Sequence, residues 1–373
     1  MRRARWLAEW RHSQEKPVFY HCISRIVDRR MVLGADEKEK FRALMRVYER
    51  FSGCRVTAYC LMDNHIHLLL EVPPMVVGGL SDRQLLDRLS ALYGASSAKV
   101  AEVTQELAEA RQWVADGVAD EEVVARIHAR YTYRMHDLGE FMKGLLQRYT
   151  QWHNGRHERS GRLWEDRFKS VIVEDGAAAR AVAAYIDLNP VRAGMVEDPA
   201  GYRWSSYGEA IGGGPRGQGR TARAGLVRAW GAHQGMEADA GLWSERVARV
   251  YRAVLMGQAA ERTRETIAMD GSGGREVLRK GMAAEKARRL QALAGEDGSV
   301  SAEVPLATVL RCRVRYFTDG AVIGSRSFVD EAFAAGRWRF GPRRRSGART
   351  LKGGAAPIAQ SLWSLRDLKK GIT

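Results

Sequence analysis

The chain has 373 residues and carries 60 Lys and Arg against 44 Asp and Glu, a formal net charge of +16. This excess favours a polyanionic partner. An anionic membrane surface is the competing partner, but it would call for a basic amphipathic helix or a lipid anchor and neither is evident. No apolar run reaches the ~18 residues of a membrane span, the N-terminus lacks the apolar stretch of a secretory signal, and the cysteines, which show no CxxC spacing, fit reduced thiols in a cytoplasmic protein.

The first 72 residues predict a β-α-β-β order. Residues 18–27, 55–62 and 65–72 have the apolar, β-branched composition of strands, and Pro73 follows the last of them. Between the first two, residues 36–52 show the amphipathic spacing of a helix, with Asp36 expected as its N-cap and Gly53 as its C-cap.

The next part of the chain predicts an insertion and a second half of the same domain. Residues 75–137 are charged and mostly helical in pattern, as expected for an arm or lid. A helix over 138–154, a strand at 171–175 and an Ala-rich helix over 176–188 follow. The sum is an α+β fold, a ferredoxin-like, RRM-related sandwich of one antiparallel sheet and packed helices.

Composition divides the chain into three parts. Residues 1–210 form the predicted domain, and the Gly- and Arg-rich residues 211–223 are a predicted linker. Residues 224–373 are predicted to be a mainly helical, basic extension. Within it, 304–336 has the pattern of a helix, a turn and a second helix, a possible DNA-reading module.

His65 and His67 are the first candidate site residues. On a strand, side chains two residues apart lie on one face, so both imidazoles would point the same way while Ile66 points to the other side. Two neutral imidazoles can hold a divalent ion. A pair of surface histidines on an edge strand is the other interpretation, and the His-x-His pattern taken by itself favours this second interpretation.

Tyr185 and Asn189 are the second candidate pair. They are four residues apart, so they share one helical face just before Pro190. The amide oxygen suits Mg²⁺ or Mn²⁺, and the phenolate is a nucleophile. A buried tyrosine and a helix-ending asparagine explain the pair equally simply. Tyr149, with His153 four residues later, is a competing nucleophile.

Basic residues gather in two further segments. Arg162, Arg167 and Lys169 flank Trp164 in a loop that could bind single-stranded DNA through charge and base stacking, or could be an ordinary solvated loop. Residues 336–373 hold ten Lys and Arg against one acidic residue. Arg343, Arg344 and Arg345 concentrate that charge in a segment that is either a solvated tail or a phosphate-binding arm.

Four motifs, taken together, resemble one family. The segments MDNHIHLLLEVP, SGRLWEDRFKS, YIDLNPVRAGMV and WSSY occur in this order over residues 18–208. They resemble the REP-associated tyrosine transposases and the single-tyrosine HUH transposases of insertion sequences. The long insertion at 75–137 and the residues beyond 208 depart from a compact member.

The resemblance implies a mechanism, residue by residue. His65 and His67 would hold Mg²⁺ or Mn²⁺, with Asn189 as the third protein ligand or a close contact. Tyr185 would attack the scissile phosphate, leaving a free 3′-OH and a 5′-phosphotyrosine. The implied partner is a single-stranded DNA hairpin or repeat, and a homodimer is expected by resemblance alone.

We therefore expect a metal-dependent enzyme that nicks and rejoins single-stranded DNA. Two alternatives stay open: a non-catalytic DNA-binding regulator that kept the fold, and a metal-dependent phosphohydrolase that uses His65 and His67 with water. A covalent protein–DNA adduct separates the first from both others.

Overall fold

The computed structural model describes the N-terminal two thirds of the chain almost continuously. The described residues are 5–213, 219–231, 243–245, 247–249, 251–252, 255, 264–267, 275–278, 315–318, 320–350 and 362–365.

The core is a βαββαβ unit. Its elements are β1 (Val18–Arg25), α1 (Ala35–Ser52), β2 (Arg55–Leu61), β3 (His65–Val72), α5 (Leu138–Arg156) and β4 (Lys169–Val173). The strands lie in the order β2-β3-β1-β4, and each neighbouring pair is antiparallel. This is the predicted ferredoxin-like arrangement.

The turns of the unit differ slightly from expectation. The helix α1 begins at Ala35 with Gly34 as its N-cap, so Asp36 lies in the first turn. It ends as predicted at Gly53, whose φ of 75° is the left-handed conformation that glycine adopts at low cost. After β1 the turn η1 (Val27–Arg29) holds Asp28 and Arg29 at positive φ.

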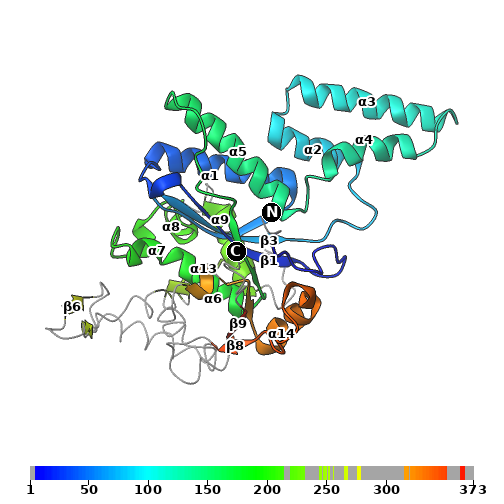
Figure 1. Ribbon diagram of the computed structural model, residues 1–373. Coiled ribbons are helices and arrows are strands. Elements are labelled where there is room, and N and C mark those ends of the chain that lie inside the picture. The colour runs from blue at the N-terminus through cyan, green and yellow to red at the C-terminus, as the bar shows by residue number, and fades with distance from the viewer. Residues whose placement is uncertain are drawn as a thin grey trace.

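The predicted insertion is helical. It consists of α2 (Asp82–Tyr93), α3 (Ala98–Ala115) and α4 (Glu122–Thr132), and Figure 1 shows it as an arm that projects from the body. Leu85, Leu89 and Val103 are buried along one side of the arm, while its outer side carries charged residues. The amphipathic spacing read from the sequence therefore corresponds to helices packed against one another.

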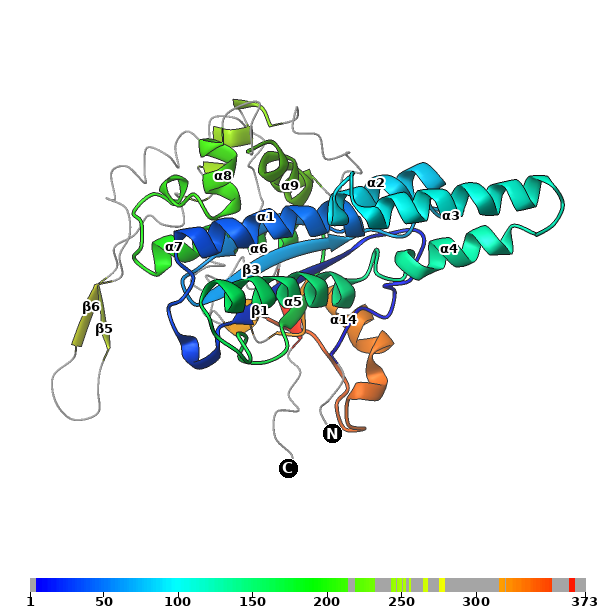
Figure 2. The same cartoon turned by 90° about the horizontal axis from the view of Figure 1, so that it is seen from above.

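Each face of the sheet carries its own core. Leu68 of β3 lies in the layer with α1 and α5, whereas Leu69 belongs to the opposite layer. That second layer contains the helix α6 (Ala177–Asp187), which is buried along nearly its whole length. Figures 1 and 2 show α1 and α5 on one side of the sheet and α6 on the other.

The chain stays packed on the sheet beyond α6. It continues through α7 (Asn189–Arg192), η2 (Pro199–Gly201), α8 (Ser206–Gly212) and α9 (Gly219–Gly231). The predicted linker at 211–223 is therefore partly wrong, because α9 begins at Gly219. Gly225 explains the packing: a Cβ there would lie 2.6 Å from the carbonyl oxygen of Val56, so the helix lies directly on β2. Arg228 of α9 forms an ion pair with Glu71 of β3 at 2.8 Å.

The described C-terminal residues add strands rather than helices alone. The strands β7 (Val322–Gly324), β9 (Trp363–Leu365) and β8 (Arg349–Thr350) extend the sheet beyond β4. The β4–β7 pair is parallel, so the seven-stranded sheet is mixed. Because β4 would otherwise be an open edge, these strands satisfy backbone groups that the first four leave unpaired.

The predicted helix-turn-helix is different in the structure. The strand β7 lies between the one-turn helix α13 (Arg315–Thr318) and α14 (Arg326–Ala335), and residues 304–314 lie outside the described residues. Of 224–290, predicted as mainly helical, the described part also contains the antiparallel pair β5 (Arg264–Ile267) and β6 (Arg275–Leu278).

Candidate functional site

The two histidines of β3 lie on the side of the sheet that α6 covers. Their ring centroids are 5.0 Å apart, His67 is 2% exposed and His65 is half-buried. On the neighbouring strand β1, Arg25 pairs with His65 and Ile23 pairs with His67. The strand period thus puts both imidazoles on one face, as predicted, and that face is buried rather than a solvent-exposed edge.

A third histidine, which the sequence analysis missed, belongs to the same cluster. His21 of β1 is fully buried, and its Nε2 lies 3.0 Å from Nδ1 of His67. Its Nδ1 lies 2.8 Å from the carbonyl oxygen of Phe317 in α13. The signal for it was available: His21, Ile23 and Arg25 alternate along a predicted strand, so they share one face.

Burial keeps the three imidazoles neutral. Desolvation lowers the pKa of His21 to about 4 and that of His65 to about 4. The pKa of His67 falls well below its ordinary value, first through desolvation and then through repulsion by His21, His65 and the nearby arginines. Neutral imidazoles are the form that binds metal ions.

Tyr185 lies directly over this cluster. Its ring centroid is 5.8 Å from that of His67 and 6.0 Å from that of His21. The guanidinium of Arg192 lies 5.1 Å from the centre of the phenol ring. On the remaining side the Phe317 ring stacks on the tyrosine at 4.6 Å, and Tyr185 is 1% exposed. The Tyr185 ring is therefore enclosed by the two histidines, Arg192 and Phe317.

Asn189 lies at the start of α7, one turn after Tyr185. Its Nδ2 donates to the carbonyl oxygens of Tyr185 at 3.1 Å and of Ile186 at 3.4 Å. These bonds fix the amide so that Oδ1 is turned away from both carbonyl groups. Tyr185 and Asn189 therefore belong to two successive helices, and the Asn189 side chain bonds back to the last turn of α6.

His65, His67 and Asn189 offer donor atoms of the kinds that divalent ions bind. Neutral imidazole nitrogens are common metal ligands, and an amide oxygen is a ligand that suits Mg²⁺ or Mn²⁺. Among the described residues no group of three or more His, Cys, Asp or Glu forms a ready metal site. His21 is consequently no third ligand, since both of its ring nitrogens already have hydrogen-bond partners.

The competing tyrosine lies elsewhere. Tyr149 is buried in the layer of α1 and α5, on the other side of the sheet from the histidines. Its hydroxyl donates to the carbonyl oxygen of Glu37 at 3.2 Å. Desolvation raises its pKa above the ordinary value, which disfavours the phenolate.

The basic loop reaches the cluster through its last residue. Lys169 pairs with Ile23, which pairs with His67, so the three share one face of the sheet. Arg162 and Arg167 are exposed in the loop before it. The indole of Trp164 is half-buried against the α1–α5 layer, and its Nε1 donates to Thr150 at 3.0 Å.

The tail arginines lie far from the histidines. They precede β8, at the opposite edge of the sheet, and four strands separate β8 from β3. Arg343 and Arg345 are exposed, while the Arg344 guanidinium lies 4.5 Å from the centre of the Phe340 ring. The structure therefore does not bring Arg343, Arg344 and Arg345 to the site.

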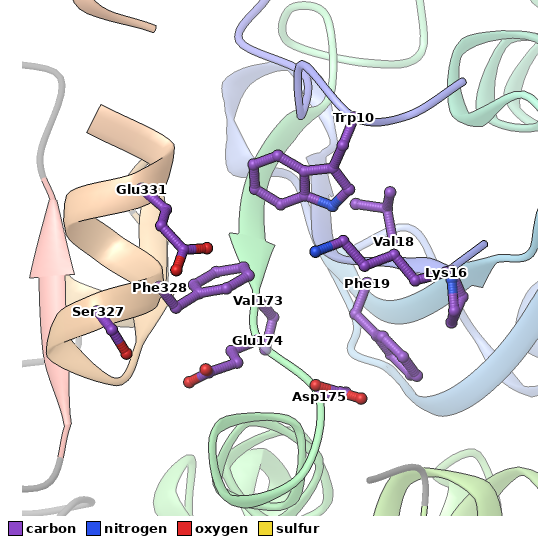
Figure 3. Close-up of a pocket in the computed structure, with 11 residues that line it drawn as sticks. Trp10, Lys16, Val18, Phe19, Val173, Glu174, Asp175, Ser327, Phe328 and Glu331 are labelled. Carbon is purple, nitrogen blue, oxygen red and sulfur yellow. The ribbon is translucent and has the colours of Figure 1, made fainter. Parts of the chain in front are cut away.

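A cavity of about 220 Å³ opens at the other end of β1 and β4. Figure 3 shows Trp10 and Phe328 on its walls, with the carboxylates of Glu174, Asp175 and Glu331 around it. Three carboxylates repel a phosphate backbone, and Phe19 and Val173 lie at the strand ends opposite Arg25 and Lys169. This cavity is not part of the histidine cluster.

Part of the chain matches the model of a known protein family. Residues 15–116 match the model described as transposase IS200 like, a stretch that contains His21, His65 and His67 but ends before Tyr185. A solved structure of a REP-associated tyrosine transposase bound to a REP hairpin is similar at 12% identity and a TM-score of 0.35, over 57% of this chain and 86% of that one. No curated protein matches. None of the described helices is both long and apolar enough to cross a membrane.

Proposed function

Because residues 15–116 match the model described as transposase IS200 like, we propose that this protein cleaves and rejoins single-stranded DNA through a covalent bond to Tyr185. One observation carries the proposal: the Tyr185 ring lies 5.8 Å from that of His67, on the buried face of the sheet. A tyrosine that merely filled the core would not require three uncharged imidazoles and an arginine around it.

The chemistry is a transesterification. The phenol oxygen of Tyr185 loses its proton and attacks the phosphorus of the scissile phosphodiester, and the bond to the 3′ oxygen breaks. The leaving 3′ oxygen takes up a proton, so the cleaved strand has a 5′-phosphotyrosine at one end and a free 3′-OH at the other. Attack by a 3′-OH on the phosphotyrosine reverses the step. Because the number of phosphoester bonds is conserved, rejoining requires no nucleotide cofactor.

His65, His67 and Asn189 are the residues that would hold the divalent metal, Mg²⁺ or Mn²⁺. When bound there, such an ion supplies charge to polarise the non-bridging phosphate oxygens and to stabilise the leaving 3′ oxygen. The chain itself contributes Arg192, whose guanidinium lies over the Tyr185 ring and favours negative charge on the attacking oxygen.

Positive side chains beside the cluster account for binding of the strand. Arg25 lies opposite His65, and Lys169 shares the row of His67. Arg162 and Arg167 continue this charge into the exposed loop. Trp164 contributes through packing that holds the loop in place, because its indole N–H is bonded to Thr150.

Tyr185 lies next to His21 and His67 of the same chain, so the proposed nucleophile does not have to come from a partner subunit. The homodimer therefore stays a prediction about assembly. Two other functions are separable by experiment: a DNA-binding regulator forms no adduct, and a phosphohydrolase releases cleaved DNA without one.

The test is covalent capture of DNA. Labelled hairpin-forming oligonucleotides, the substrate class that the sequence resemblance implies, are incubated with the protein and Mg²⁺ or Mn²⁺ and separated on a denaturing gel. We expect an adduct that EDTA abolishes. The Tyr185→Phe variant should lose it by a factor of at least about 10³ while keeping DNA binding, because only the attacking oxygen is removed.

Tyr149→Phe is the matched control, since it removes a buried hydroxyl on the other side of the sheet. It should form the adduct at the wild-type rate. An adduct that persists in Tyr185→Phe and disappears in Tyr149→Phe would refute the assignment of the nucleophile. Cleavage without any adduct would favour the phosphohydrolase.

A further inference from the structure

The hydrogen bonds around His67 determine which of its ring nitrogens carries the proton. A carbonyl oxygen only accepts, so Nδ1 of His21, 2.8 Å from the oxygen of Phe317, must carry a hydrogen. In the neutral ring Nε2 of His21 is then an acceptor. Since it lies 3.0 Å from Nδ1 of His67, that nitrogen must be the donor, which leaves Nε2 of His67 with its lone pair.

The same reasoning applies to His65 through a different partner. Nδ2 of Asn64 donates to the carbonyl oxygen of Arg29 at 3.1 Å, which fixes the orientation of the amide. Its Oδ1 therefore faces Nδ1 of His65, 2.7 Å away, and only accepts. His65 is protonated on Nδ1, and its Nε2 also keeps the lone pair.

We propose that His21 and Asn64 are positioning residues that hold His67 and His65 in the Nδ1–H tautomer, so that both Nε2 atoms are ready to bind a divalent metal. The inference rests on the proposed function, because it assigns the two histidines to the metal. Both chains of hydrogen bonds end on a backbone carbonyl, of Phe317 and of Arg29. The protonation of the ligands is thus determined by the fold rather than by solvent.

The opposite tautomer is disfavoured by the same contacts. If Nε2 of His67 carried the hydrogen, its Nδ1 would have to accept from His21, whose Nδ1 would then lack a hydrogen. Two acceptors would face each other at 2.8 Å, inside a fully buried cluster. A doubly protonated His21 would place a charge there, and burial opposes it.

The test measures the tautomers directly, without metal or DNA. Protein labelled with ¹⁵N-histidine gives long-range ¹H–¹⁵N spectra in which the protonated nitrogen of each ring is identified. At pH 7.5 we expect Nδ1–H for His21, His65 and His67. Detection of Nε2–H as the main form of His65 or His67 in the wild type would overturn the inference.

Variants then test which residues determine the tautomers of His65 and His67. His21→Leu should release His67 from the Nδ1–H form and weaken Mn²⁺ binding, followed by electron paramagnetic resonance, about 10- to 100-fold. His21→Gln, whose amide can accept from His67 and donate to Phe317, should restore much of both. Asn64→Ala should change His65 and leave His67 in its wild-type form.

A control variant separates the effect of losing any buried histidine from the effect of losing the His21–His67 hydrogen bond. His153 of α5 is also buried, and its two ring nitrogens have no hydrogen-bond partner within the described part of the chain. His153→Leu should leave both tautomers and Mn²⁺ affinity unchanged. If His21→Leu leaves the His67 tautomer and the Mn²⁺ affinity unchanged, the inference is overturned. If the wild-type protein has the expected tautomers but does not bind Mn²⁺, the metal role in the proposed function is refuted instead.

Discussion

At the scale of single residues, Tyr185 and Asp187 of α6 point to different sides of the helix. Tyr185 faces the histidines, whereas Asp187, two residues later, is rotated by about 200° around the helix. Asp187 is fully buried and accepts hydrogen bonds from Ser206 at 2.6 Å, the Tyr207 amide at 3.0 Å and Tyr251 at 2.7 Å. Desolvation outweighs these bonds and raises its pKa to about 6.

This raised pKa predicts a pH dependence of stability. The folded-state pKa of Asp187 lies above its ordinary value of 3.8, so the contribution of Asp187 to the free energy of unfolding is fully present below about pH 4 and is lost as pH rises through about 6. A shift of this size corresponds to at most roughly 3 kcal/mol. Asp187→Asn keeps the acceptor oxygen and cannot ionise, so its unfolding free energy relative to wild type should rise between pH 4 and pH 7.

The measurement is urea unfolding of both proteins across that pH range. The difference between them isolates Asp187 from the histidines, whose lowered pKa values make the wild type less stable as pH falls from about 6.5 to about 4. Parallel profiles of wild type and Asp187→Asn would contradict the prediction.

At the scale of secondary-structure elements, the short helix α13 covers Tyr185 and the histidine cluster. It supplies the Phe317 ring that stacks on Tyr185 and the carbonyl oxygen that accepts from His21. Phe317 is buried almost completely, and so is Tyr185 beneath it. A strand of DNA and this helix cannot occupy the same side of the tyrosine.

Weakening the cover should therefore speed the reaction. Phe317→Ala removes the stacked ring and keeps the backbone carbonyl. Aromatic pairs contribute roughly 0.5–1.5 kcal/mol, so the rate of adduct formation should rise about twofold to tenfold. Phe333→Ala, which removes a buried ring from α14 in the other core layer, is the control for general loosening. Equal rates in wild type and Phe317→Ala, or an equal rise in both variants, would argue against a cover.

At the scale of the whole molecule, the basic C-terminal residues also complete the sheet. The strand β9 pairs with β7, and Leu362, Leu365 and Phe340 are buried. The tail is therefore neither a purely solvated segment nor a free arm in the residues that the structure describes. Its exposed arginines, Arg343 and Arg345, project from a packed framework.

This arrangement predicts different effects of removing the tail and removing its charge. Deleting 336–373 should lower the melting temperature by many degrees, because each of the large apolar side chains lost contributes roughly 2 kcal/mol. Arg343→Gln with Arg345→Gln should melt like the wild type. If both arginines bind phosphate, the salt slope of single-strand binding should fall by about 1.4.

Calorimetry and DNA-binding titrations at several salt concentrations check both statements. An unchanged slope in the double variant would remove Arg343 and Arg345 from the DNA-binding surface. A deletion that melts at the wild-type temperature would contradict the packing of β9.

Local pattern alone predicted much of the fold. Runs of apolar, β-branched residues and the breaks at Gly53 and Pro73 gave β1, α1, β2 and β3 nearly to the residue, because the strands are buried on both faces and α1 has one buried side. The 75–137 arm followed from amphipathic spacing. The period of two along a strand put His65 and His67 on one side, and helical spacing put Tyr185 with Asn189.

What only the tertiary structure decided depends on contacts between distant parts of the chain. Spacing along the sequence did not reveal that β7 and β9 would pair beyond β4, that Gly225 would lie against β2, or that Trp164 would face the core. The same holds for the meeting of His21 and His67, 46 residues apart, and of His21 and the Phe317 carbonyl, 296 apart. Local periodicity determines which face a residue occupies; the packing of layers determines what it meets there, and so which tyrosine lies over the histidines.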